Sequence, residues 1–179
     1  MDQIKTESAL PPLVSIVGKS GSGKTTLVEK IIHELTKKGL RVGSIKHHYH
    51  QGNLEIDHPG KDSWRHKQAG AERVVISSPN KIGIIMDVEH DHALDELIPY
   101  FSGMDIVLSE GFKREDKPKV EIFRSGVHKE PLCLDDDDLI AIITDMEDLD
   151  LKAPRFALDD IAGLMDLIVK HFNLPARGE

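Results

Sequence analysis

The sequence predicts an α/β fold, in which a mostly parallel sheet is flanked by helices and carries an added β-hairpin. The chain opens with a short, continuous apolar run at residues 13–17, which is typical of a strand buried on both faces. A glycine-rich turn and a segment with helical apolar spacing follow, and a second strand-like run comes next. This order of strand, helix and strand indicates a parallel βαβ unit.

The first helix is expected over residues 24–39. Its apolar residues recur at helical spacing, and Lys37, Lys38 and Gly39 form a C-terminal stop signal. A second strand is expected at 40–47. The segment from His47 to Pro59 has no hydrophobic periodicity, so it is interpreted as a loop.

Two apolar runs, at 73–77 and 81–86, flank the turn sequence Ser-Pro-Asn and predict a hairpin, a feature foreign to a plain doubly wound sheet. The C-terminal segment 158–172 has one apolar face and is expected to form a helix capped by Asp159 or Asp160. The other expected elements are short helices at 61–70 and 93–101, and strands at 105–109, 119–124 and 139–144.

The length of 179 residues suits one domain, which we place at 13–173 after a flexible arm at 1–12. A net charge of −8 argues against a nucleic-acid partner. No apolar run approaches the ~20 residues that span a bilayer, and the N-terminal residues lack signal-peptide features, so no membrane partner is expected. The single cysteine, Cys133, fits a reducing compartment, and a cytoplasmic location is predicted.

The turn after the first strand reads GKSGSGKTT and matches the P-loop pattern G-x-x-x-x-G-K-[ST]. Such a loop turns its backbone N–H groups toward phosphate oxygens, and the helix N-terminus adds its own free N–H groups. We therefore predict a P-loop NTPase fold, with Lys24 at the β- and γ-phosphates and the Thr25 hydroxyl on Mg²⁺. The predicted nucleotide-binding residues of the loop are Gly18, Lys19, Ser20, Gly21, Ser22, Gly23, Lys24, Thr25 and Thr26.

Lys19 has two interpretations. In the MinD/ParA-like branch of P-loop proteins, a lysine just after the first glycine acts across a dimer. A solvated loop lysine is the simpler alternative.

A P-loop protein needs an acid near Mg²⁺, at the end of a strand beside the loop. Asp105 opens the strand at 105–109 and lies roughly 16 Å from its far end, at ~3.3 Å per residue. Glu110 ends this strand, at the carboxyl edge where parallel sheets bind ligands. We therefore predict Glu110 as a Mg²⁺ ligand and, with Lys24, as a catalytic residue. Lys113 and Arg114 follow, and they either meet an anion or are solvated.

The loop after the second strand contains four histidines. A zinc site formed by His48, His50 and His58 is one interpretation, although no cysteine is near. In the other, the strand delivers the loop to the phosphate edge, where the anionic ligand or Mg²⁺ is contacted by Lys46, the histidines, Asp57, Lys61 and Arg65. Asp57 would then be either a direct Mg²⁺ ligand or a partner of the groups that bind the ion. For any single histidine, a flexible polar loop remains an alternative.

The P-loop, the segment IKHHYHQGNLEIDHPGKDSWRHKQAGA, and the strands DIVLSEGFK, KVEIFR and LIAIITD occur here in this order. Together they resemble the MobB family, molybdopterin-guanine dinucleotide biosynthesis protein B, over roughly residues 13–170. The resemblance implies a GTP-binding, usually dimeric protein with slow, Mg²⁺-dependent GTP hydrolysis. It also implies an adaptor role beside the molybdenum cofactor guanylyltransferase, with molybdopterin as a further ligand for the loop at 46–62.

Base recognition is not evident, because the sequence lacks the Asn-Lys-x-Asp motif of many GTP-binding proteins. Asp145 ends the strand at 139–144 and is the candidate to accept guanine N1–H and N2–H, although a cap or turn role fits equally well. A small-molecule kinase using ATP is the alternative function. Such kinases commonly carry an arginine-rich lid, but the segment 111–130 has only Arg114 and Arg124.

Overall fold

The computed structural model describes residues 10–48, 54 and 56–176 of the chain. These residues belong to two compact units, one formed by residues 1–47 and 93–179 and the other by residues 48–92. We call them the sheet unit and the hairpin unit. Whether residues 13–173 form one domain stays a prediction. Of the predicted arm at 1–12, residues 1–9 lie outside the described residues, and the Pro12 carbonyl already accepts the Val107 N–H at 2.9 Å.

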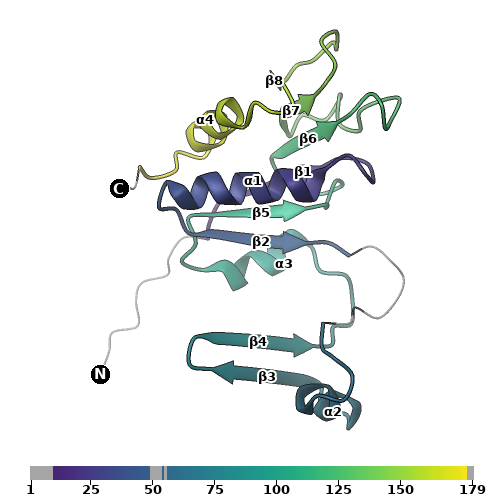
Figure 1. The fold of residues 1–179 in the computed structure, drawn as a ribbon, viewed down its shortest axis with the longest axis vertical. Helices are drawn as coiled ribbons and strands as arrows, with labels where there is room; N and C mark the ends of the chain where they lie inside the picture. Colours follow the sequence, from purple (N-terminus) through teal and green to yellow (C-terminus); the bar gives the residue numbers. More distant parts are fainter. Residues whose placement is uncertain (1–9, 49–53, 55, 177–179) are drawn as a thin grey trace. The chain divides into compact units, whose positions relative to one another are not determined.

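The sheet unit is built on one six-stranded sheet in the order β2-β5-β1-β6-β7-β8, and its strand pairs are parallel (Figure 1). The strands are β1 (Leu13–Val17), β2 (Val42–Lys46), β5 (Ile106–Glu110), β6 (Lys119–Phe123), β7 (Leu139–Thr144) and β8 (Arg155–Phe156). The parallel sheet expected from the sequence is confirmed. Only the two-residue β8 went unpredicted, because so short a strand carries no periodicity.

Two long helices pack on one face of the sheet. These are α1 (Lys24–Lys37) and α4 (Ile161–His171), which share a core with alternate strand residues such as Val14 and Ile16 (Figure 1). Asp160 is the cap of α4, because its Oδ1 accepts the Gly163 N–H at 2.9 Å.

The other face of the sheet packs against a shorter helical segment. Leu13 and Val107 of the strands form a cluster there with Leu94 and Ile98. The helix expected at 93–101 is instead two pieces, α3 (Leu94–Leu97) and the 3₁₀ turn η1 (Ile98–Phe101). Pro99 explains the difference, because proline has no N–H and its ring clashes with the carbonyl four residues back.

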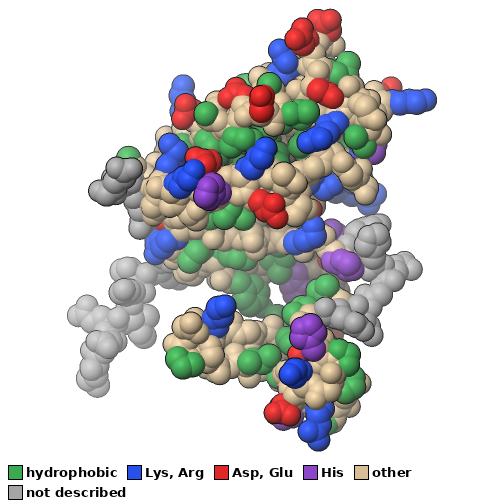
Figure 2. Space-filling model, in the orientation of Figure 1, with side chains coloured by type: hydrophobic (Ala, Val, Ile, Leu, Met, Phe, Trp, Pro, Cys, Tyr) green, Lys and Arg blue, Asp and Glu red, His purple; other side chains and the backbone are tan. Residues whose placement is uncertain are grey.

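The hairpin unit contains α2 (Asp62–Gln68), β3 (Arg73–Ser78) and β4 (Lys81–Met86), and β3 and β4 pair in antiparallel register. The hairpin is thus confirmed. Its strands carry large hydrophobic residues that remain exposed, and such side chains are visible at the unit's surface in Figure 2. The most exposed of them are Val75 (56%), Ile82 (71%) and Ile84 (55%).

None of the helices that the structure describes has the length and hydropathy that crossing a bilayer requires.

Candidate functional site

The P-loop joins the end of β1 to the start of α1, as predicted. Gly18 and Gly23 both have positive φ, at 150° and 99°. A Cβ on Gly18 would lie 2.5 Å from the Ile122 carbonyl oxygen and 2.7 Å from Ser22 Oγ. Only glycine therefore fits where the loop passes β6.

Lys24, the first residue of α1, folds back over this loop. Its Nζ donates to the carbonyl oxygens of Gly18 and Lys19, at 2.9 Å each. Burial lowers the pKa of Lys24; Lys46 and Lys113 lower it further, while Glu110 opposes them. Lys46 and Lys113 are thus close enough to Lys24 to act on its charge, and such an excess of positive charge suits a polyphosphate.

Thr25, Glu110 and Lys46 meet at one carboxylate oxygen. Thr25 Oγ1 donates to Glu110 Oε1 at 2.8 Å, and Lys46 Nζ donates to the same atom at 2.5 Å. The sheet brings them together, because β5 lies between β1 and β2, with Lys46 opposite Glu110. Burial alone would raise the pKa of Glu110, but the hydrogen bonds from Lys46 and Thr25 outweigh it and hold this pKa below its ordinary value.

Asp105, the rejected candidate for the Mg²⁺ acid, lies at the other end of β5. Its carboxylate accepts the Arg41 backbone N–H at 2.7 Å and pairs with the Arg41 guanidinium at 3.1 Å. The structure therefore brings Glu110, and not Asp105, beside the P-loop. The metal-binding and catalytic roles of Glu110, Thr25 and Lys24 stay predictions.

The turn after Glu110 adopts an unusual backbone. Gly111 and Phe112 both have positive φ, at 105° and 53°, a rare conformation for an aromatic residue. Phe112 is buried and its ring lies 4.6 Å from that of His47. The Gly111 N–H donates to the Ile16 carbonyl of β1 at 3.1 Å. These contacts fix the end of β5 against both neighbouring strands, and local strain of this kind is common at functional sites.

Residues 124–131, which the sequence analysis considered only as part of a candidate kinase lid, pack against the first half of the P-loop. Lys19 Nζ donates to the Glu130 carbonyl at 2.9 Å, and His128 Nε2 donates to the Ser20 carbonyl at 2.8 Å. Lys19 is therefore bonded within its own chain in this structure. The sequence feature that could have indicated this packing is Glu121, because a carboxylate inside an apolar strand needs hydrogen-bond partners from another segment.

Glu121 anchors the end of this segment from inside the sheet. It is 1% exposed and accepts the N–H groups of Leu132 and Cys133 at 2.6 and 2.9 Å. Burial raises its pKa, and these two hydrogen bonds oppose that shift. Burial likewise raises the pKa of the Cys133 thiol, to about 12, as is typical of a cysteine packed inside a fold.

Asp145, the candidate for base recognition, lies exposed at the end of β7. Its Oδ1 accepts the Ser125 N–H at 2.9 Å, and this bond lowers the pKa of its carboxyl. The turn role is therefore visible, while contact with guanine stays a prediction.

Asp57 and Lys61 belong to the hairpin unit. Asp57 Oδ1 accepts the His58 N–H at 2.8 Å, and Lys61 immediately precedes α2. Their contacts with a nucleotide or with Mg²⁺ stay predictions. The zinc interpretation also stays untested, because His50 lies outside the described residues.

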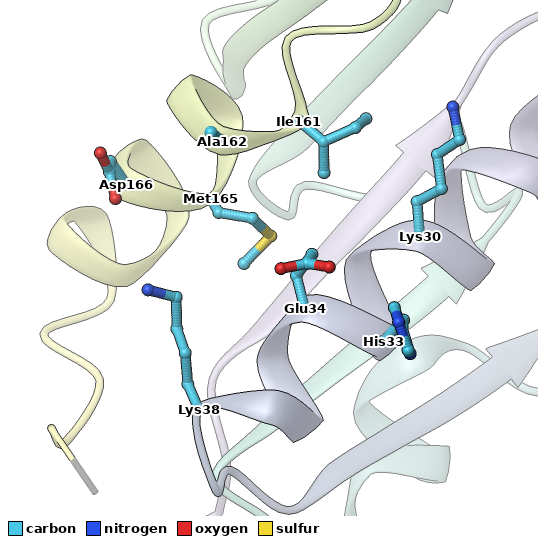
Figure 3. A pocket seen from close by; sticks show the side chains of 8 residues that line it. All are labelled: Lys30, His33, Glu34, Lys38, Ile161, Ala162, Met165 and Asp166. Atoms are coloured by element: carbon cyan, nitrogen blue, oxygen red, sulfur yellow. The ribbon is translucent and has the colours of Figure 1, made fainter. Parts of the chain in front are cut away.

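A cavity of about 370 Å³ lies elsewhere, between α1 and α4 (Figure 3). It is lined by Lys30, His33, Glu34, Lys38, Ile161, Ala162, Met165 and Asp166. The close-up shows Met165 of α4 pointing toward Glu34 of α1. Its lining mixes basic and acidic side chains and includes none of the P-loop residues, so it is not part of the predicted nucleotide site.

Comparisons with known proteins identify the family. The family model of MobB, molybdopterin guanine dinucleotide synthesis protein B, matches residues 13–145. A molybdopterin-guanine dinucleotide biosynthesis adapter protein of Haemophilus influenzae is 38% identical over 169 residues, which cover 90% of this chain and 92% of that protein. Its counterpart in Escherichia coli is 33% identical, over 89% and 92% of the two chains. The crystal structure of Bacillus subtilis MobB matches with a TM-score of 0.73 at 30% identity, over 94% of this chain and 99% of that one.

Proposed function

This chain belongs to the MobB family, and we propose that it is an adaptor in molybdopterin guanine dinucleotide biosynthesis that binds GTP with Mg²⁺ at its P-loop. The adapter role comes from the names of the two bacterial relatives. The observation that carries nucleotide binding is the convergence of Thr25, Glu110 and Lys46 beside the P-loop.

The side-chain oxygen atoms of Thr25 and Glu110 are the type of ligand that Mg²⁺ prefers. Mg²⁺ in nucleotide sites is held by few protein oxygens, with phosphates and water completing its shell. Thr25 Oγ1 and Glu110 Oε1 already lie 2.8 Å apart and would both be ligands. When bound, the ion would neutralise charge on the β- and γ-phosphates.

Two lysines would change partners when the nucleotide binds. Lys24 would release the carbonyls of Gly18 and Lys19 and reach the β- and γ-phosphates. Lys46 would leave Glu110 to the metal and turn its ammonium toward the terminal phosphate. Both side chains are long and flexible enough to move in this way. The groups that they contact now are one carboxylate and two carbonyl oxygens, and these acceptors are not specific for a lysine.

We propose at most slow GTP hydrolysis. Phosphoryl transfer depends mainly on positioning and charge stabilisation, which Lys24 and Glu110 would supply.

An adapter would hold its nucleotide while it meets its partner. We propose the molybdenum cofactor guanylyltransferase as that partner, and molybdopterin as a ligand of the loop at 46–62. A cytoplasmic location also remains part of this proposal.

The exposed apolar side chains of the hairpin unit support the proposal that the protein is a homodimer. A two-stranded hairpin is only marginally stable by itself, and exposed apolar patches mark interaction surfaces. Val75, Ile82 and Ile84 are each more than half exposed. We propose that a second copy of the chain covers them. A molecular mass of one chain by sedimentation at micromolar concentration would contradict this.

Calorimetric titration of the purified protein with GTP and with ATP, each with and without Mg²⁺, tests the nucleotide proposal. We expect Mg²⁺-dependent binding that prefers GTP. Binding of ATP as tight as that of GTP would contradict the proposal and favour a small-molecule kinase. Binding of neither nucleotide would contradict both functions.

A further inference from the structure

Two buried polar atoms of the sheet unit have no hydrogen-bond partner among the described residues. They are Ser22 Oγ and Arg124 Nε. Buried polar atoms nearly always have a partner, so each exception needs an explanation. The two residues lie far apart in sequence but close together in the fold, because Ser22 belongs to the P-loop and Arg124 directly follows β6.

The Arg124 guanidinium lies against the start of α1. Its Nη2 is 3.4 Å, and its Cζ 3.7 Å, from the position that a Cβ on Gly23 would occupy. Gly23 is the N-cap of α1, so the free N–H groups of the first helical turn begin at this point. A cation at the positive end of a helix dipole is unfavourable unless an anion binds there as well.

The backbone holds Arg124 in this place. Its carbonyl accepts the N–H groups of Val127 and His128, at 3.0 Å each, in a tight turn. His128 in turn donates to the Ser20 carbonyl of the P-loop. On the other side, the Ser125 N–H is bonded to Asp145. The main chain at Arg124 is therefore fixed beside the P-loop before any ligand arrives, and this lowers part of the entropy that binding would cost.

The strand order indicates how a nucleotide would be oriented across the P-loop. Glu110 and Lys46 lie on the β5 side of β1, whereas Arg124 lies on the β6 side. The metal and the terminal phosphate belong to the Glu110 side. A nucleotide that extends across the P-loop from there would bring its nucleoside end to β6.

We propose that Arg124 binds the α-phosphate of the nucleotide. The guanidinium is suited to this, because its planar set of donors matches two phosphate oxygens at once. This inference rests on the proposed nucleotide-binding function. It adds a recognition residue on the β6 side, opposite the metal.

Binding of a fluorescent GDP analogue to Arg124→Gln tests the assignment. Arg155→Gln is the matched control, because Arg155 is an exposed arginine of β8, at the edge of the sheet. We expect Arg124→Gln to weaken GDP and GTP about tenfold each, the scale of one charge-assisted contact, and to leave the half-saturating Mg²⁺ concentration unchanged. The control should bind like the wild type.

Thermal unfolding separates a binding role from a structural one. If Arg124 serves a ligand, the nucleotide-free variant should unfold at the wild-type temperature or above it, while the stabilisation by added GDP shrinks. A lower unfolding temperature without nucleotide, together with wild-type affinity, would overturn the inference.

The outcomes also separate this inference from the proposed function. If the wild type binds GDP, Lys24→Ala does not, and Arg124→Gln binds normally, only the inference about Arg124 fails. If the wild type binds neither GDP nor GTP, the proposed function fails and the inference fails with it.

Discussion

The strand pair β2–β5 has a carboxylate and a cation at each of its two ends, and their surroundings differ. At the amino end of β5, Asp105 pairs with Arg41 and accepts its backbone N–H. At the carboxyl end, Glu110 pairs with Lys46 and also accepts the Thr25 hydroxyl. Both carboxylates are mostly buried, with side chains 7% and 11% exposed.

The two ion pairs differ in how readily each carboxylate could exchange its cation for a ligand. The Arg41–Asp105 pair joins the chain before β2 to the start of β5, and an arginine fork bonded to a carboxylate is a stable structural contact. The Lys46–Glu110 pair lies beside a P-loop and a positive-φ turn, and its cation is a single flexible ammonium. We infer that the first pair serves stability and the second serves the ligand.

The largest expected effect is at the P-loop itself. Lys24→Ala should weaken GTP binding about 100-fold or more, because the ammonium would contact two phosphates, while the fold survives. Calorimetry measures the affinity, and circular dichroism verifies the fold. Lys30→Ala, on the exposed side of the same helix, is the control and should bind normally. Retained affinity in folded Lys24→Ala would refute the assignment of the phosphate site.

The second effect concerns stability at the amino end. Asp105→Asn should lower the thermal midpoint by about 3 °C, because the carboxylate loses its charge opposite Arg41 while remaining mostly buried. Asp150→Asn, at an exposed acid, should leave the midpoint unchanged. Calorimetric melting curves of both variants measure this. If Asp105→Asn melted like the wild type, the structural role of the Arg41 pair would have to be abandoned.

The smallest effect is expected at Lys46. Its ammonium and Mg²⁺ compete for Glu110, so Lys46→Met with saturating GDP should need about threefold less Mg²⁺, the scale of a partly exposed ion pair. A Mg²⁺ titration monitored by nucleotide fluorescence measures this, with Lys37→Met as the control. A higher Mg²⁺ requirement would show that Lys46 holds Glu110 in place and does not compete with the ion.

The sequence predicted those parts of the molecule that depend on neighbouring residues. The P-loop lies between a strand and a helix that are contiguous with it, so pattern and context could be read together. Glu110 was identified over Asp105 because the direction of a parallel strand decides which end meets the ligand. The hairpin followed from two apolar runs around one short turn.

The parts that escaped prediction depend on contacts between distant residues. The bond from His128 to Ser20 spans 108 positions, and the bond from Lys19 to Glu130 spans 111. No local periodicity encodes such contacts, so Arg124 and its segment were considered only as part of a kinase lid and were not expected beside the P-loop. The break at Pro99 is different, because the residue itself carries the signal and its effect on the helix was overlooked.

The most direct test of the account is the Mg²⁺ dependence of GTP binding in Glu110→Gln and in Asp105→Asn. Glutamine keeps the size of the side chain but removes the charge that would hold the ion. The account predicts that Glu110→Gln needs about tenfold more Mg²⁺ for half-saturation, whereas Asp105→Asn titrates like the wild type. Titration curves that coincide for Glu110→Gln and the wild type would contradict the central claim that the carboxyl end of β5 is the metal side of a nucleotide site.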